Sequence, residues 1–210
     1  MITSINEYKQ FLNESSEETI RVTCAGLARI IIDGKYLFIL NKNSVKIGKP
    51  SYGPCGGALE FEEAARPFLE SLNCLFEKGM DLRLMMPTSN FEKYLEWFNT
   101  KQNREASALR EVYEELVDEE KVINLDGIES FPLREQYIKT NTEDKLSARQ
   151  GFEGTKTKGI YEIYSVTLPE EGEKQILEYV KNSSDQKVIL LTKEEALTDP
   201  RLGTHCKYIL

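Results

Sequence analysis

A cluster of acidic side chains occupies residues 110–115, which read REVYEE. Successive residues of a helix are rotated by about 100°, so a helix through this run places Glu111, Glu114 and Glu115 within one arc of its surface. Three carboxylates at close range repel one another unless a cation neutralises them, and Arg110 can pair with Glu114 across one turn. Mg²⁺ binds a few carboxylates together with water and phosphate oxygens. The run therefore predicts a metal site for a diphosphate, although the same pattern is also typical of a solvated helical face.

The elements next to this run must position it. Residues 104–121 predict one long helix, because apolar residues recur along them at helical spacing. Two apolar runs, 20–32 and 36–40, flank an Asp-Gly pair, which is a strong β-hairpin pattern. Residues 50–57, PSYGPCGG, then predict a loop in which the backbone can approach a ligand closely.

Helical and strand patterns are mixed through the rest of the chain, which predicts an α/β or α+β class. Residues 64–103 contain two apolar stretches at helical spacing and predict an inserted helical pair. Residues 139–158 are polar without a clear period and predict a long exposed loop or a mobile hairpin. The other predicted helices are 5–13, 173–181 and 192–197, and the other predicted strands are 122–131, 159–168 and 187–191. Thr192 and Glu195 have the spacing of a capping box.

The composition favours one domain over residues 1–210 with a large insertion. A chain of 210 residues with 40% hydrophobic content can bury one substantial core. Its net charge of −8 argues against binding to nucleic-acid backbones or anionic membranes, so an anionic ligand needs a local cation. No apolar run approaches the ~20 residues of a membrane-spanning helix, and the N-terminus does not have the order of a secretory signal. We therefore expect a cytoplasmic protein without nucleic-acid or membrane partners.

Cysteine and histidine usage narrows the chemistry further. The four cysteines are scattered without a C-x-x-C pair, which argues against a structural zinc site and a disulfide framework. His205 is the single histidine, and no third ligand or base accompanies it and Cys206, so we expect both to be structural. Acid–base work then falls to carboxylates, lysines and tyrosines.

The order of these features resembles the Nudix hydrolase family, whose signature reads G-x5-E-x7-R-E-U-x-E-E-x-G-U, with U apolar. Gly57 and Glu63 match its first half, and the REVYEE run matches its second half. Four other segments are similar to parts of that fold, from its opening hairpin to its closing strand and short helix: 25–40, 52–60, 159–168 and 190–197. The resemblance implies a Nudix-like α/β/α sandwich with a mixed β-sheet and an inserted helical pair.

The sequence departs from the family pattern in two places. Between Glu63 and the REVYEE run lie 46 residues where the family has seven, so 39 are extra. Glu63 can stand beside the helix only if this insertion leaves and returns at nearly the same point, which costs little closure entropy. Val117 replaces the glycine after the double glutamate and Asp118 the next apolar residue, so we expect the helix to continue through Glu119.

The resemblance also implies a role for each matching side chain. Glu111, Glu114 and Glu115 would be ligands of Mg²⁺, or of Mn²⁺ in its place. Arg110 would orient these carboxylates, and Glu63 would support the metal or its water.

The backbone and the general base complete the implied site. Gly56 and Gly57 would let the backbone approach the ligand closely. The family often takes its general base from a variable loop, which makes Glu153 and Glu143 candidates. Glu153 is explained equally well as an ordinary turn residue.

The implied function is Mg²⁺-assisted attack of water on a diphosphate linkage in a nucleotide or nucleoside diphosphate derivative. A second hypothesis is a Nudix-fold module that senses a nucleotide without cleaving it. A third, a purely structural interaction domain, fits the carboxylate cluster least well. The substrate stays open among the classes that Nudix relatives bind: nucleoside triphosphates, ADP-ribose, dinucleoside polyphosphates, capped RNA and non-nucleotide diphosphates.

Aromatic residues in the insertion have two interpretations. Tyr94, Trp97 and Phe98 offer rings that can stack on a nucleobase, but their spacing more often packs a helix onto its domain, and we favour packing. The helical pair also has apolar residues on several sides, which makes a homodimer a further expectation.

Overall fold

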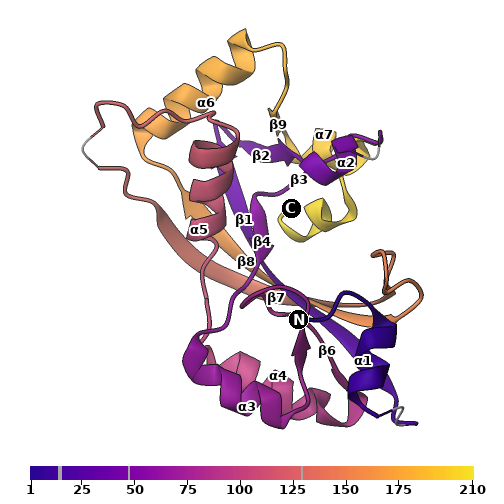
Figure 1. Ribbon diagram of the computed structural model, residues 1–210. Coiled ribbons are helices and arrows are strands. Elements are labelled where there is room, and N and C mark those ends of the chain that lie inside the picture. Colours follow the sequence, from indigo (N-terminus) through magenta and orange to yellow (C-terminus); the bar gives the residue numbers. More distant parts are fainter. Residues whose placement is uncertain (14–15, 47, 129) are drawn as a thin grey trace. The chain divides into compact units, whose positions relative to one another are not determined.

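The computed structural model describes residues 1–13, 16–46, 48–128 and 130–210, except for the side chain of residue 43 (Figure 1). Its α-helices are α1 (Ile5–Phe11), α2 (Lys42–Lys46), α3 (Arg66–Ser71), α4 (Phe91–Thr100), α5 (Leu109–Tyr113), α6 (Glu170–Asn182) and α7 (Lys193–Thr198). Its strands are β1 (Thr19–Ile32), β2 (Lys35–Leu40), β3 (Tyr52–Gly53), β4 (Gly56–Ala58), β5 (Leu75–Phe76), β6 (Arg83–Pro87), β7 (Arg134–Leu146), β8 (Lys156–Thr167) and β9 (Val188–Leu191). Shorter helical segments are η1 (Glu63–Ala65), η2 (Thr88–Asn90), η3 (Glu114–Glu119) and η4 (Thr204–Tyr208). Helices combined with a mostly antiparallel, open sheet confirm the predicted mixed class.

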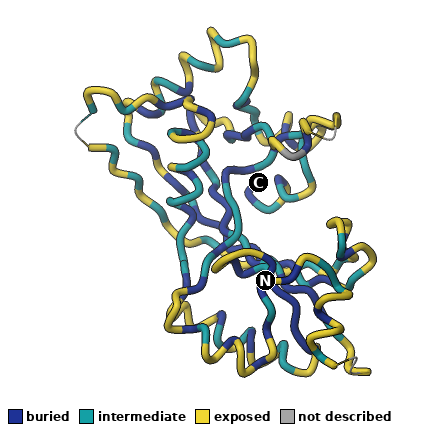
Figure 2. Tube along the Cα trace, in the orientation of Figure 1, coloured by how far each residue is buried: buried dark blue, intermediate teal, exposed yellow. Residues whose placement is uncertain are grey.

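The chain forms two compact units, each with its own apolar core. The first unit comprises Met1–Ala25, Ala58–Ala106 and Thr140–Glu162, and the second comprises Gly26–Gly57, Ser107–Lys139 and Ile163–Leu210. Figure 2 shows buried residues along the strands of each unit, and many exposed residues on the outer turns of α3, α4 and α6. The prediction of one domain with an insertion stays a prediction.

In the first unit, the start of β1 pairs antiparallel with β6, so that Thr19 lies opposite Pro87. Strand β6 pairs in turn with β5, and helices α3 and α4 pack onto the same core. Tyr94 and Phe98 of α4 are fully buried in this core, and Trp97 packs against it from a partly buried position. The structure therefore confirms the packing interpretation of these aromatic residues.

The insertion at residues 64–103 holds more than the predicted helical pair. Helices α3 and α4 confirm the pair, but β5 and β6 lie between them. Met85 and Met86 in β6 are fully buried, and this strand pairs with β1. Periodicity missed the two strands because a short apolar run fits a buried strand and a buried helix equally well.

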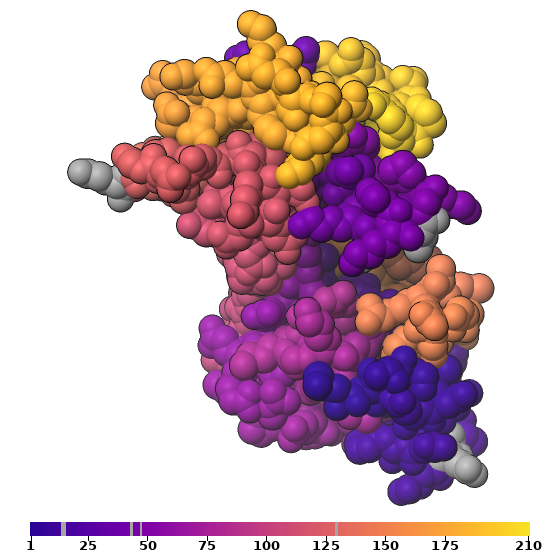
Figure 3. All heavy atoms as spheres, turned by 45° about the horizontal axis from the view of Figure 1, so that its top comes forward, coloured from indigo at the N-terminus to yellow at the C-terminus, as the bar shows by residue number. Residues whose placement is uncertain are grey.

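In the second unit, the end of β1 and β2 form the predicted hairpin. Asp33 and Gly34 have positive φ angles of 49° and 74°, which a type I′ turn requires. Strand β2 also pairs antiparallel with β3 and with β9. Val112 in α5 and Leu116 in η3 join the core of this unit, as does α6, which Figure 3 shows in gold at the surface.

The helix predicted over residues 104–121 is shorter than expected at its start. It begins at Leu109, because Arg104 forms a β-bridge with Phe61 and is therefore extended. Its end is confirmed, since the helix continues through Glu119.

The strand predicted over residues 122–131 is wrong for the described part of that range, with residue 129 outside it. The amides of Val122 and Ile123 both donate to the carbonyl of Leu116, at 2.9 and 3.0 Å. These two bonds close the end of the helix, so the amides do not take part in a sheet.

Most other predicted elements are confirmed. Strand β7 pairs with β8, so residues 139–158 belong to the hairpin alternative rather than to an open loop. Helices α1, α6 and α7 and strands β8 and β9 lie where the sequence predicts them. Thr192 and Glu195 form both hydrogen bonds of the capping box. No helix among the described residues has the length and apolar character that crossing a bilayer requires.

Candidate functional site

The acidic cluster lies on the helix formed by α5 and η3 in the second unit, the acidic helix. Its first turn is held by Glu135 of β7, whose carboxylate accepts a hydrogen bond from the Ala108 amide at 3.0 Å. Such an amide has no partner within its own helix, so the bond stabilises the helix start. Sequence reasoning missed Glu135, because no local pattern relates it to a helix so far upstream in the chain.

The second half of this helix winds as a π-helix. The amide of Glu120 donates to the carbonyl of Glu115 at 3.0 Å, five residues back. π-turns inside helices often accompany functional sites. The segment is held at its end by Lys42, whose ammonium group lies 2.9 Å from Glu119 and 3.0 Å from Glu120.

Glu115 is a strongly desolvated carboxylate of the cluster. It is partly buried and accepts a hydrogen bond from the Gly56 amide at 2.9 Å. Burial raises the pKa of Glu115 to about 8, and the negative charges of Glu111 and Glu119 raise it further, while the Gly56 amide opposes the shift. A nearby cation would therefore stabilise the charged form of this carboxyl group.

Gly56 and Gly57 lie directly against the helix carboxylates. A Cβ atom on Gly57 would overlap the carboxylate of Glu111, so only a glycine leaves room for that group. Gly56 has a φ of 151°, and a Cβ there would overlap the carbonyl oxygen of Gly26. The Gly-Gly backbone thus forms a close wall for Glu111 and Glu115.

Arg110 is the cation of the cluster. Its Nη1 lies 2.8 Å from Glu111 Oε1 and 3.3 Å from Glu114 Oε2. The sequence predicted the second pair and not the first, which depends on the side-chain orientation of Glu111. One guanidinium group therefore contacts two of the three carboxylates.

The residues fit a divalent cation by the chemistry of their donors. All three are carboxylates, which suit Mg²⁺, and the desolvation of Glu115 favours a cation beside it. Within the described part of the chain, no group of three or more His, Cys, Asp or Glu side chains is gathered closely enough to hold a metal ion. Arg110 contacts Glu111 and Glu114 in this arrangement.

Glu63 belongs to the first unit, whereas the helix carboxylates belong to the second. It lies in η1 and is exposed, and Arg66 binds it through Nε at 2.5 Å. The hydrogen bond from Arg66 lowers the pKa of Glu63. Its predicted role beside the metal stays a prediction.

Both candidates for the general base also belong to the first unit. Glu153 is exposed in the turn between β7 and β8. Glu143 is partly buried and contacts Lys145 at 3.2 Å and the Tyr161 hydroxyl at 3.3 Å. The carboxylate of Glu143 therefore already accepts hydrogen bonds from Lys145 and Tyr161.

Replacing Gly57 with alanine should reduce function more than stability. The new Cβ displaces the Glu111 carboxylate, which is the end of a flexible side chain, so we expect a change in unfolding free energy of about 1 kcal/mol or less. We expect Mg²⁺ affinity and any turnover to fall by roughly tenfold. Calorimetric Mg²⁺ titration and thermal unfolding measure the two effects.

Gly53 provides the matched control, because a Cβ there meets no atom within 4 Å. Gly53→Ala should leave Mg²⁺ affinity unchanged. Gly56→Ala should instead destabilise the fold, since its Cβ would meet backbone at a positive φ. Equal Mg²⁺ affinities for Gly57→Ala and Gly53→Ala would contradict the role assigned to Gly57.

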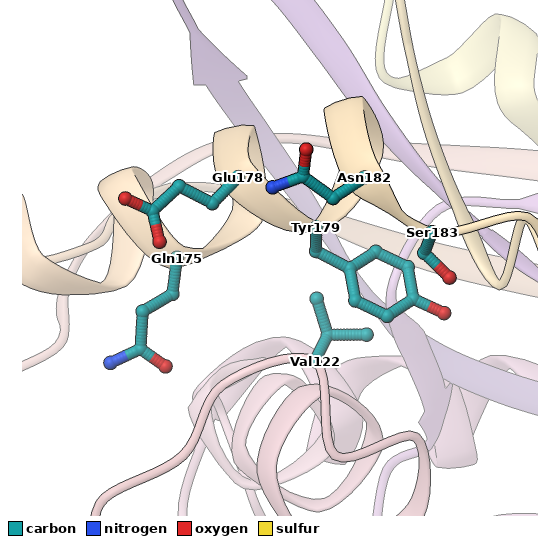
Figure 4. A pocket seen from close by; sticks show the side chains of 6 residues that line it. All are labelled: Val122, Gln175, Glu178, Tyr179, Asn182 and Ser183. Atoms are coloured by element: carbon teal, nitrogen blue, oxygen red, sulfur yellow. The ribbon is translucent and has the colours of Figure 1, made fainter.

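A separate pocket of 390 Å³ lies along α6 in the second unit (Figure 4). It is lined by Val122, Gln175, Glu178, Tyr179, Asn182 and Ser183. Gln175 exchanges hydrogen bonds with the backbone of Asn124, and the Tyr179 hydroxyl donates to Asp185. These polar groups have structural partners, and Glu178 is the single acidic side chain in the lining, so the acidic helix is the better candidate site.

Comparison with known proteins agrees with the order of motifs. The family model described as SMODS-associated NUDIX domain matches residues 19–210. No curated protein matches the chain. The family match confirms the Nudix resemblance that Gly57, Glu63 and the REVYEE run indicated.

Proposed function

Because the chain belongs to the SMODS-associated NUDIX domain family, we propose that it hydrolyses a diphosphate linkage in a nucleotide or nucleoside diphosphate derivative. One observation carries the proposal: two helix carboxylates, Glu111 and Glu115, are held against the backbone of Gly56 and Gly57. In the reaction, the oxygen of water bonds to phosphorus as the bridging oxygen leaves. The products are a nucleotide and a phosphorylated remainder.

Glu111, Glu114 and Glu115 would hold Mg²⁺, or Mn²⁺ in its place. When bound, the metal would neutralise charge on the phosphates and make water a stronger nucleophile. The Gly56 amide orients Glu115 through its hydrogen bond, and Arg110 orients the other two carboxylates.

Glu63 and the general base have roles of their own in the proposal. We propose that Glu63 supports the metal or its water, and that Glu153 acts as the general base. Glu153 ranks before Glu143, because Lys145 and Tyr161 already engage Glu143. We also propose that the chain is one Nudix domain with an insertion. The protein would form a homodimer through this insertion, and light scattering would test its oligomeric state.

A nucleotide sensor without hydrolysis is the second candidate. The contact of Arg110 with both Glu111 and Glu114 favours it, since a guanidinium group can neutralise these carboxylates without a metal. The helix also continues through Val117, where the family signature has a glycine. The backbone that follows the REVYEE run therefore differs from the family pattern, which also favours the sensor.

A substrate panel separates the two functions. The protein is incubated with Mg²⁺ and nucleoside triphosphates, ADP-ribose, dinucleoside polyphosphates, capped RNA or non-nucleotide diphosphates, and products are identified by mass spectrometry. Cleavage of one compound that disappears with EDTA supports the hydrolase. Saturable binding of one compound, with the whole panel unchanged, supports the sensor.

A further inference from the structure

Arg29 lies in the middle of β1, in the second unit. Its neighbours Ala28 and Ile30 join the core that contains Val112 and Leu116 of the acidic helix. Side chains alternate between the two faces of a strand, so Arg29 points to the opposite face of the sheet.

The Arg29 guanidinium group is partly buried and has no partner among the described residues. Its Nε is inaccessible to solvent and has no hydrogen-bond partner, and the described side chains form no ion pair with it. Buried arginines elsewhere in the chain are paired: Arg21 lies 2.6 Å from Glu77, and Arg104 lies 2.8 Å from Glu162. A polar atom that is shielded from water and has no hydrogen-bond partner costs free energy, which an anionic ligand would offset.

The surroundings of Arg29 strengthen its attraction for an anion. Leu27, on the same face of β1, is 5% exposed. Ala28 and Ile30, which flank Arg29 along the strand, are each 1% exposed. Apolar neighbours lower the local dielectric constant, and a planar guanidinium group matches the geometry of phosphate oxygens.

The strand also connects Arg29 to the acidic helix. Next to it, the Ala28 amide donates to the Cys55 carbonyl at 2.8 Å, and the following residue, Gly56, donates to Glu115. The same stretch of β1 therefore positions both the Gly-Gly backbone and Arg29.

We infer that Arg29 binds a phosphate group of the nucleotide ligand. The inference rests on the proposed function only in taking a nucleotide as the ligand, and it requires neither metal nor turnover. It assigns the sheet face opposite the acidic helix to ligand recognition.

Calorimetric titration with inorganic pyrophosphate and with ADP, both in EDTA, tests the inference. The wild-type protein should bind at least one probe saturably, more weakly as salt is raised. Arg29→Gln should weaken that binding by about tenfold or more, since it removes a charged hydrogen-bond donor. The affinity of Arg29→Lys should lie between those of the wild type and Arg29→Gln, because lysine retains the charge but lacks the planar guanidinium group.

Arg134 is the matched control: it is exposed, lies in the same unit and has no partner among the described residues. Arg134→Gln should bind the probes like the wild type. Without ligand, Arg29→Gln should melt no lower than the wild type, because Arg29 has no partner to lose among the residues that the structure describes.

Three outcomes would overturn the inference. They are equal affinities of the wild type and Arg29→Gln, no saturable binding of either probe by the wild type, and a large drop in the melting temperature of ligand-free Arg29→Gln. The last would make Arg29 a structural residue. A panel without cleavage leaves these binding results intact, so failure of the hydrolase proposal is distinguishable from failure of this one.

Discussion

Glu115→Gln should abolish Mg²⁺-dependent cleavage, lowering kcat by on the order of 100-fold or more. The substitution keeps the size of the side chain and its hydrogen bond from Gly56, but it removes the charge that a metal requires. Glu114→Gln should act in the same direction. Initial rates on whichever panel compound is cleaved, measured across Mg²⁺ concentrations, would show the loss.

Glu178→Gln is the control for these two variants, since it removes an exposed glutamate of the same unit that lies on α6. It should retain wild-type rates and wild-type Mg²⁺ dependence. If cleavage survived in both Glu114→Gln and Glu115→Gln, the assignment of the metal site would be wrong.

Without metal, the protein should lose stability as the pH rises from about 5 to 8. The pKa of Glu115 is about 8 in the folded chain, against an ordinary value of 4.5. Between these values the folded state holds a proton that the unfolded state has released, so raising the pH favours unfolding. At 1.36 kcal/mol per pH unit, the loss is roughly 4 kcal/mol, and it levels off above pH 8.

Calorimetric unfolding in EDTA at pH 5, 6, 7 and 8 measures this dependence. Other carboxyl groups also titrate, so the wild type is compared with Glu115→Gln, which lacks this proton. The variant should melt higher than the wild type at pH 8, with a small difference at pH 5. Added Mg²⁺ should raise the wild-type melting temperature most at pH 8, where the ligands are deprotonated. If the melting temperatures of the two proteins changed in parallel with pH, the raised pKa of Glu115 would be excluded.

The sequence predicted best those elements whose signals are local. The hairpin at Asp33 and Gly34 requires two residues with positive φ, and both signals lie within the turn. The capping box at Thr192 depends on residues three apart, and the structure has both of its hydrogen bonds. Amphipathic periodicity located α6 for the same reason.

The errors occurred where long-range pairing overrides local preference. Helical periodicity continues upstream to residue 104, but pairing of Arg104 with Phe61 delays the helix until Leu109. Apolar residues 122–123 have strand propensity, yet their amides bond to the end of the helix. The strands inside the insertion depend on β1, which precedes them by about 60 residues and gives no local signal.

For the candidate site, the sequence by itself determined which groups are present and in what order. The REVYEE run, the two glycines and Glu63 indicated the family, and the family match confirms it. Their types and spacing are local properties of the chain, so they could be recognised without coordinates.

Only the tertiary structure decided the state of each group. It placed Glu115 against the Gly56 amide, directed Arg110 toward Glu111 as well as Glu114, and left Arg29 without a partner among the described residues. Desolvation, pKa and ion pairing depend on what surrounds a side chain, and those surroundings come from segments far apart in the sequence. For this reason the carboxylates were predictable as a set, whereas the raised pKa of Glu115 and the lack of a partner for Arg29 within the described part of the chain were not.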